Sequence, residues 1–216
     1  MEKGEFVKIN YTGRVAETGQ LFDTTIKEDA EKENIRNPNA VYKALGVIIG
    51  EGFVIKGLDD SLAEHKPGDK YKIKIKPENA FGPRNPNFMR LIPLNVFKKK
   101  EVMPFPGMSV DIDDMVGIVR SVSGGRVIVD FNHPLAGKEI EYEVEIVEKI
   151  EKKEEKALLI AEYFEMKADS IEFKEDKATV SLLKSCPEQV KKKVAETMQK
   201  HLNLKEVDYV EKFKAD

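Results

Sequence analysis

Residues 50–59 read Gly50-Glu51-Gly52-Phe53-Val54-Ile55-Lys56-Gly57-Leu58-Asp59. Two glycines favour a turn, three apolar residues of strand-like character follow, and Leu58 with Leu62 makes an i, i+4 apolar pair that is typical of a short helix. A dinucleotide-binding loop would need a third glycine and a helix directly after the turn, and this stretch has neither. It therefore predicts a turn and a short helix rather than a nucleotide site.

Working outward from this stretch, the flanking residues favour β structure. Apolar and polar residues alternate from Phe6 to Ile9, and the pattern reaches Tyr11 before an expected break at Thr12-Gly13. Residues 70–76 alternate strictly, with Tyr71, Ile73 and Ile75 on one face and lysines on the other, so one face of that strand is expected to be solvated. The remaining expectations are a second apolar stretch ending at Leu21-Phe22, a loop or short helix over 27–36 and a strand over 41–49.

The amino-acid composition changes after Gly82-Pro83. Five prolines and four of the seven methionines lie between residues 83 and 115. Strand-like runs return at 115–119 and 127–129, joined by a hairpin at Ser123-Gly124-Gly125, which indicates a small β unit. A final long strand is expected from Tyr142 to Ile150.

The charge-balanced run at residues 148–156 is the best candidate for a domain boundary, because it is nearly devoid of apolar side chains. Beyond it we expect a helix over 157–164, a hairpin from 171–173 and 178–183, a helix over 187–202 with an apolar stripe, and a strand over 205–213. This tail is a small α+β unit near the lower size limit for a self-sufficient core. A helical stripe of this kind serves either as internal core or as an interface.

Composition limits the function classes. The 216 residues predict one or two domains, and 36 Lys and Arg against 39 Asp and Glu give a net charge of -3, so nucleic-acid binding is not expected. One cysteine and three scattered histidines favour no disulfide, metal or cofactor site. Neither a signal peptide nor a bilayer-spanning run is visible, so we expect a cytoplasmic protein with no membrane partner.

The chain also lacks the signatures of conventional catalysis. His65, His133 and His201 have no partner pattern for activating a nucleophile. No G-x-S-x-G or phosphate-binding G-x-x-x-x-G-K motif occurs. The lysine triplets at 98–100 and 191–193 are expected to be solvated surface.

Several motifs in one order nevertheless point to a family. They are Lys8-Ile9-Asn10-Tyr11-Thr12-Gly13, Gly19-Gln20-Leu21-Phe22-Asp23-Thr24-Thr25, the stretch 50–59, and Pro77-Glu78-Asn79-Ala80-Phe81-Gly82. Together they resemble the FKBP-type peptidyl-prolyl cis-trans isomerases. Residues 129–138 resemble the segment that re-enters the isomerase domain in the SlyD-like subgroup, whose flap loop carries an inserted chaperone domain. The order of parts is similar to the long archaeal type.

The resemblance implies an α+β fold, with an FKBP-like antiparallel β-sheet wrapped on a short helix, an inserted small β domain and a C-terminal small α+β domain. The implied domains are 1–85 for the first part of the isomerase, 86–129 for the insert, 130–150 for the last isomerase strand and 151–216 for the C-terminal domain. The implied prolyl pocket is lined by Tyr11, Phe22, Asp23, Leu45, Val54, Ile55, Leu58, Phe81, Leu135 and Tyr142.

Three pocket positions depart from the best-known single-domain pattern. Leu58 stands where many members place a Trp, Phe81 where a Tyr hydroxyl would donate to the substrate carbonyl, and Leu45 where an aromatic residue is usual. Tight binding of macrolide drugs is therefore not expected. Taken singly, a residue such as Tyr11 or Phe22 on a strand is more often plain core, and Asp23 could cap a turn.

The insert offers eight apolar side chains for binding unfolded polypeptide: Met89, Leu91, Ile92, Val96, Phe97, Met103, Phe105 and Met108. Methionine adapts to partners of different shape, and an edge strand can pair with an extended chain. The alternative is that these residues are the core of a small domain.

Three functions remain open from the sequence. The favoured one is a peptidyl-prolyl cis-trans isomerase with a chaperone insert, whose partners are unfolded polypeptides with Xaa-Pro bonds. The second is a holdase chaperone with little or no prolyl turnover, because Leu58 and Phe81 alter the pocket. The third is a scaffold that assembles through its tail, and a homodimer through that tail would complete a small domain.

Overall fold

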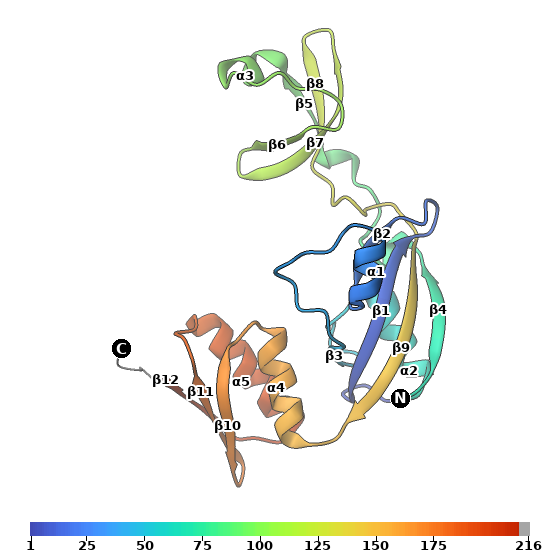
Figure 1. The fold of residues 1–216 in the computed structure, drawn as a ribbon. Coiled ribbons are helices and arrows are strands. Elements are labelled where there is room, and N and C mark those ends of the chain that lie inside the picture. The colour runs from blue at the N-terminus through green and yellow to red at the C-terminus, as the bar shows by residue number, and fades with distance from the viewer. Residues whose placement is uncertain (212–216) are drawn as a thin grey trace.

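The computed structural model describes residues 1–211. It contains three separate β-sheets with helices beside them, and the chain is a mixed α+β protein with mainly antiparallel strands (Figure 1). Within these residues no helix is both long and apolar enough to cross a lipid bilayer.

The first sheet has β1 (Phe6–Val15) and β9 (Ile140–Ile150) at its centre, paired antiparallel along their length. On this sheet β2 (Leu21–Thr24) and β3 (Leu45–Ile48) pair with β1, and β4 (Lys70–Ile75) pairs with β9. The helix α2 (Lys56–Glu64) buries Leu58 and Leu62 in the same core as the inner face of the sheet. The short helix predicted from the opening stretch is confirmed.

The strict alternation of β4 is also confirmed, since its lysines are exposed while Ile75 is buried. The expected loop or short helix at 27–36 is the helix α1 (Lys27–Lys32). The strand expected over 41–49 is shorter than predicted and covers only β3.

The break expected at Thr12-Gly13 is wrong, because β1 runs through both residues. Gly13 pairs with Asp23 on one side and with Tyr142 on the other, and the irregularity in register comes one residue later, against β2. The pairing of β1 with a strand on each side holds this glycine in the sheet, which outweighs its weak strand propensity.

The second sheet has the order β5-β8-β7-β6, from β5 (Met89–Pro93), β8 (Arg126–Asp130), β7 (Met115–Ser123) and β6 (Ser109–Ile112). The hairpin predicted between β7 and β8 is confirmed. The strands β5 and β6 and the helix α3 (Leu94–Lys99) lie in the segment that the prolines made look irregular. Figure 1 shows this unit standing away from the first sheet on two chain segments, the outgoing one carrying the 3₁₀ helices η1 (Pro77–Asn79) and η2 (Pro86–Phe88).

The C-terminal unit has α4 (Lys153–Tyr163), β10 (Ala168–Lys174), β11 (Lys177–Leu182), α5 (Glu188–Leu202) and β12 (Glu206–Glu211). The predicted hairpin is the antiparallel pair β10 and β11, and α5 crosses over to bring β12 parallel to β11. The predicted last strand was extended to Phe213, which lies outside the described residues.

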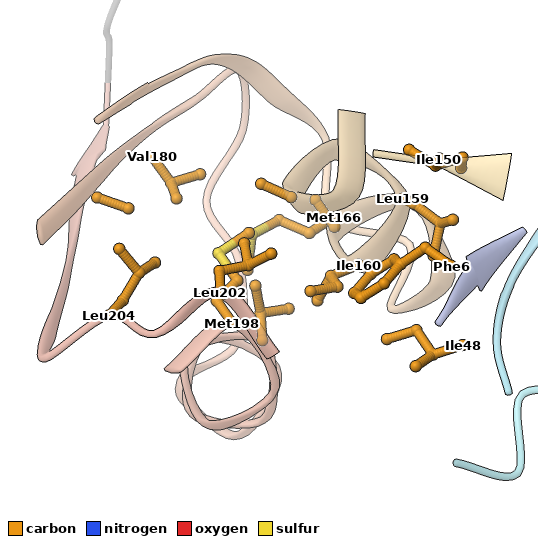
Figure 2. Packing of buried hydrophobic residues seen from close by; sticks show 14 of the residues in the cluster. Phe6, Ile48, Ile150, Leu159, Ile160, Met166, Val180, Met198, Leu202 and Leu204 are labelled. Carbon is orange, nitrogen blue, oxygen red and sulfur yellow. The ribbon is translucent and has the colours of Figure 1, made fainter. Parts of the chain in front are cut away.

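The core of this unit is continuous with one end of the first sheet. Phe6, Ile48 and Ile150 belong to the same buried cluster as Leu159 and Ile160 of α4, as Figure 2 shows. The apolar stripe of α5, with Val194, Met198 and Leu202, faces this shared core. Residues before and after the charged run at 148–156 are therefore buried together in one core.

Candidate functional site

Four aromatic rings gather at one end of the first sheet. Tyr11 of β1 and Tyr142 of β9 meet edge to face, with ring centroids 5.5 Å apart. Phe22 of β2 meets Tyr142 at 5.8 Å and Phe81, which follows η1, at 5.9 Å, both also nearly perpendicular. Edge-to-face contacts of this kind fix ring orientation, so the rings form a defined apolar wall.

Gly13 makes this close approach possible. A Cβ atom on Gly13 would lie 2.7 Å from Cζ of Phe22 and 2.8 Å from Cε1 of Tyr142. Any larger residue in this part of β1 would displace one of the two rings.

Aliphatic side chains surround the rings. Leu58 is buried on α2, and its cluster includes Tyr142. Leu45 of β3, Val54 and Ile55 before α2, and Leu135 in the turn after the insert pack against the same cluster while keeping part of their surface exposed. The structure thus brings nine of the ten pocket residues predicted from the sequence into one apolar cluster.

Asp23, the tenth, is exposed and reaches this cluster through a hydrogen bond. The Tyr11 hydroxyl donates to Oδ2 of Asp23 over 2.7 Å. Burial of the phenol, and then the hydrogen bond and charge of Asp23, raise the pKa of Tyr11 above its ordinary value. Burial and the charge of Asp23 also raise the pKa of Tyr142. The Tyr11 hydroxyl is thus fixed as a hydrogen-bond donor to Asp23.

His133 was not predicted to belong to this site. Its ring stacks on Phe81, with centroids 4.7 Å apart and planes 4° from parallel, and its Nδ1 accepts the Leu135 backbone N–H over 3.2 Å. The contact between His133 and Phe81 could not be predicted from the sequence, because 52 positions separate them in the chain. The one available signal that His133 lies near the site was its position directly before Pro134-Leu135, because Leu135 was predicted to line the pocket.

A groove of about 600 Å³ continues from these rings toward the insert. Its apolar lining includes Phe81, Phe88 and Phe131, and His133 lies on its wall. The groove joins the aromatic wall of the first sheet to the base of the second sheet.

The eight apolar side chains predicted for the insert divide by burial. Met89, Leu91, Met103 and Phe105 are exposed, whereas Ile92 and Phe97 are buried in the core of the second sheet. Val96 and Met108 are half-buried against that core. Phe88 and Val116, which were not predicted, add further exposed apolar surface.

Within residues 1–211 no three His, Cys, Asp or Glu side chains come together as a metal-binding group. The site is a cluster of aromatic and aliphatic side chains with one exposed carboxylate bonded to it. Partly exposed apolar side chains of this kind suit contact with an apolar group of a ligand.

Comparisons with known proteins agree with this class. Residues 1–96 match the model of the FKBP-type peptidyl-prolyl cis-trans isomerase family, and residues 90–135 match the model described as FKBP26, IF domain. A short-type peptidyl-prolyl cis-trans isomerase of Methanocaldococcus jannaschii is 30% identical over 146 residues, which cover 68% of this chain and 92% of that protein. The SlyD isomerase of Pasteurella multocida is 32% identical over 111 residues, which cover 50% of this chain and 55% of that protein.

Among solved structures, the three FKBP domains of wheat FKBP73 are similar at a TM-score of 0.37 and 18% identity, over 70% of this chain and 40% of that one. The chain belongs to the FKBP-type peptidyl-prolyl cis-trans isomerase family, with SlyD proteins among its relatives. It is a peptidyl-prolyl cis-trans isomerase.

Proposed function

We propose that the cluster around Leu58 is the prolyl pocket, lined by the ten residues that the sequence singled out, and that the insert delivers unfolded polypeptide to it. The observation that carries the proposal is the ring wall of Tyr11, Phe22, Phe81 and Tyr142, with Asp23 holding the Tyr11 hydroxyl.

The chemistry follows from amide resonance. Rotation about an Xaa-Pro bond is opposed by a barrier of about 18–20 kcal/mol, because the twisted amide loses its resonance. The planar amide separates charge, which water solvates, so an apolar pocket disfavours the planar form relative to the twisted one. The rings and Leu58 supply that environment, and the exposed Asp23 fixes Tyr11 at its rim.

The insert contributes the client surface. Met89 and Leu91 of β5 and Met103 and Phe105 of the loop between α3 and β6 are exposed, while Ile92 and Phe97 support that unit from its core. Strands β5 and β6 are its edges, so an extended chain could pair with either. Tethering a client beside the pocket raises its local concentration there.

The domain boundaries remain those drawn from the sequence, with an isomerase domain of 1–85 and 130–150, an insert of 86–129 and a C-terminal domain of 151–216. The partners we propose are unfolded polypeptides with Xaa-Pro bonds in the cytoplasm, and a second copy of the chain through residues 151–216.

The test compares two activities of two full-length variants with those of the parent chain. One is the cis-to-trans rate of an Xaa-Pro tetrapeptide, and the other is the refolding rate of a protein limited by a prolyl bond. We expect Asp23→Ala to lower both, because it frees the Tyr11 ring. We expect a triple variant, in which Leu91, Met103 and Phe105 are all replaced by Ser, to lower the catalysed refolding rate at least tenfold more than the tetrapeptide rate.

The control for the triple variant replaces Lys98, Lys99 and Lys100 by Gln, since these side chains are exposed on the same unit. For Asp23 the control is Asp60→Ala, an exposed carboxylate on α2 that pairs with Lys56. Equal losses in both assays for the Ser variant would contradict the division of labour. Suppression of client aggregation without tetrapeptide turnover in the parent chain would favour the holdase alternative.

A further inference from the structure

The loop of residues 50–53, which leads into the proposed pocket, is contacted from two sides. Residues 50–53 run directly into Val54 and Ile55, and two glycines with positive φ, Gly50 at 81° and Gly52 at 71°, give this loop its course. On the inner side Asp59 of α2 accepts the backbone N–H groups of Gly50 and Gly52 over 2.8 and 3.1 Å. Glycine-rich backbone holds its shape only where the surroundings fix it, so the contacts on the outer side matter as well.

The outer contacts come from the C-terminal unit. Tyr163, at the end of α4, stacks on Phe53 with ring centroids 3.7 Å apart and planes at 24°, and its hydroxyl donates to the Gly52 carbonyl over 3.4 Å. Phe53 packs against both the shared C-terminal core and the core that contains Leu58. Phe53 therefore connects α4 directly to the backbone that leads into Val54.

The helix α5 provides a second contact on the same loop. Lys200 donates from Nζ to both carboxylate oxygens of Glu51, over 2.7 and 2.8 Å, and this lowers the pKa of Glu51. His201 lies with Nε2 3.6 Å from the same carboxylate, and its ring meets Phe6 edge to face. Glu51 is thus held by Lys200 near the end of α5, and the ring of the next residue lies beside it.

We propose that the C-terminal unit braces the prolyl pocket, and that Tyr163 and Lys200 are positioning residues which act through Phe53 and Glu51 on Val54 and Ile55. The inference rests on the proposed pocket. Neither residue contacts the ring wall, so any effect on turnover must pass through the 50–55 loop. In this arrangement a domain outside the isomerase sheet sets the shape of the substrate site.

The decisive variant is Tyr163→Ala in the full chain, with Tyr163→Phe as its rescue and Leu158→Ala as its control. Leu158 lies on the same helix and is 43% exposed against 39% for Tyr163. We expect Tyr163→Ala to raise KM for an Xaa-Pro tetrapeptide about fivefold with less than a twofold change in kcat, because the pocket wall is displaced while the ring wall remains. Tyr163→Phe keeps the stack and should restore KM, and Leu158→Ala should leave it unchanged.

Lys200→Gln gives an independent test that does not endanger the core, because this side chain is mostly exposed. It should raise KM in the same direction by about twofold, whereas Lys192→Gln, on the exposed face of α5, should not. A lower melting temperature for Tyr163→Ala with unchanged KM and kcat would overturn the brace, provided that Asp23→Ala still lowers turnover. If Asp23→Ala also leaves turnover unchanged, the pocket assignment itself fails.

Discussion

At the scale of single residues, Gly13 is where sequence and site depend on each other most directly. It is a strand residue without a side chain, and the space above it is filled by the rings of Phe22 and Tyr142. We predict that Gly13→Ala displaces at least one ring, costs about 1–3 kcal/mol of unfolding free energy through overpacking, and lowers kcat/KM for a tetrapeptide severalfold.

Gly117→Ala is the matched control for this prediction. Its Cβ would lie 2.6 Å from Val129 and 2.8 Å from Phe131 in the second sheet, so it should cost similar stability there. Urea unfolding and tetrapeptide turnover of both variants decide the matter. A Gly13→Ala protein with parental turnover would show that the ring positions do not set the rate.

The motif residues that the structure brings together could be named from the sequence, because their order along the chain is specific. Tyr11, Phe22 and Phe81 were named for that reason, and the structure gathers them. The roles of Gly13 and His133 could not be predicted, since each depends on a distance through space between segments far apart in the chain. For the same reason the expected strand break at Gly13 was wrong.

At the scale of elements, α4 is the piece that joins the C-terminal unit to the isomerase sheet. Its Leu159 lies directly over Gly46 of β3, where a Cβ on the glycine would come within 2.3 Å of the leucine Cγ. Leu159 is also buried beside Phe6 and Ile48 (Figure 2). The helix therefore packs on the sheet as closely as a core element does.

We predict that Leu159→Ala lowers the unfolding free energy by about 2–5 kcal/mol, because a cavity opens in a shared core. Since that core spans both units, the first sheet and the C-terminal sheet should unfold in one transition before and after the change. Urea unfolding followed by hydrogen exchange in β1 and β11 measures this. Leu158→Ala, one residue away and exposed, should have little effect, and two separate transitions in the parent chain would contradict the shared core.

The sequence predicted a domain boundary near residue 150 but did not predict this contact. Apolar residues such as Phe6 and Ile150 show the same alternation whether a helix of the same domain or of the next one covers them. In the insert, strands β5 and β6 were hidden for a different reason, because the prolines around them break the period by which short strands are recognised.

At the scale of the whole molecule, two chain segments connect the isomerase to the insert, and we call them the neck. They meet around one buried carboxylate. Asp130 is 2% exposed, and its Oδ2 accepts two hydrogen bonds from Arg120, over 3.1 and 2.9 Å, and pairs with Arg84. Its Oδ1 accepts from the backbone and side-chain nitrogens of Asn132 over 3.0 and 2.8 Å. Asn132 in turn bonds the backbone of Asn85 in both directions, so the outgoing and returning segments are tied together.

We predict that Asp130→Asn loosens this neck. The amide keeps one acceptor oxygen but turns an NH₂ group toward guanidinium or amide donors, and the charge that held Arg84 and Arg120 is lost. Trypsin should then cleave after Arg84 several times faster than in the parent chain, as mass spectrometry of the fragments would show. Refolding catalysis should fall more than tetrapeptide turnover, because a client held on a loose insert spends less time near the pocket. The control is Asp111→Asn, which changes an exposed carboxylate of the same unit. Unchanged cleavage after Arg84 would mean that backbone hydrogen bonds alone hold the neck closed, such as the one from the Gly137 N–H to the Gly82 carbonyl at 2.8 Å.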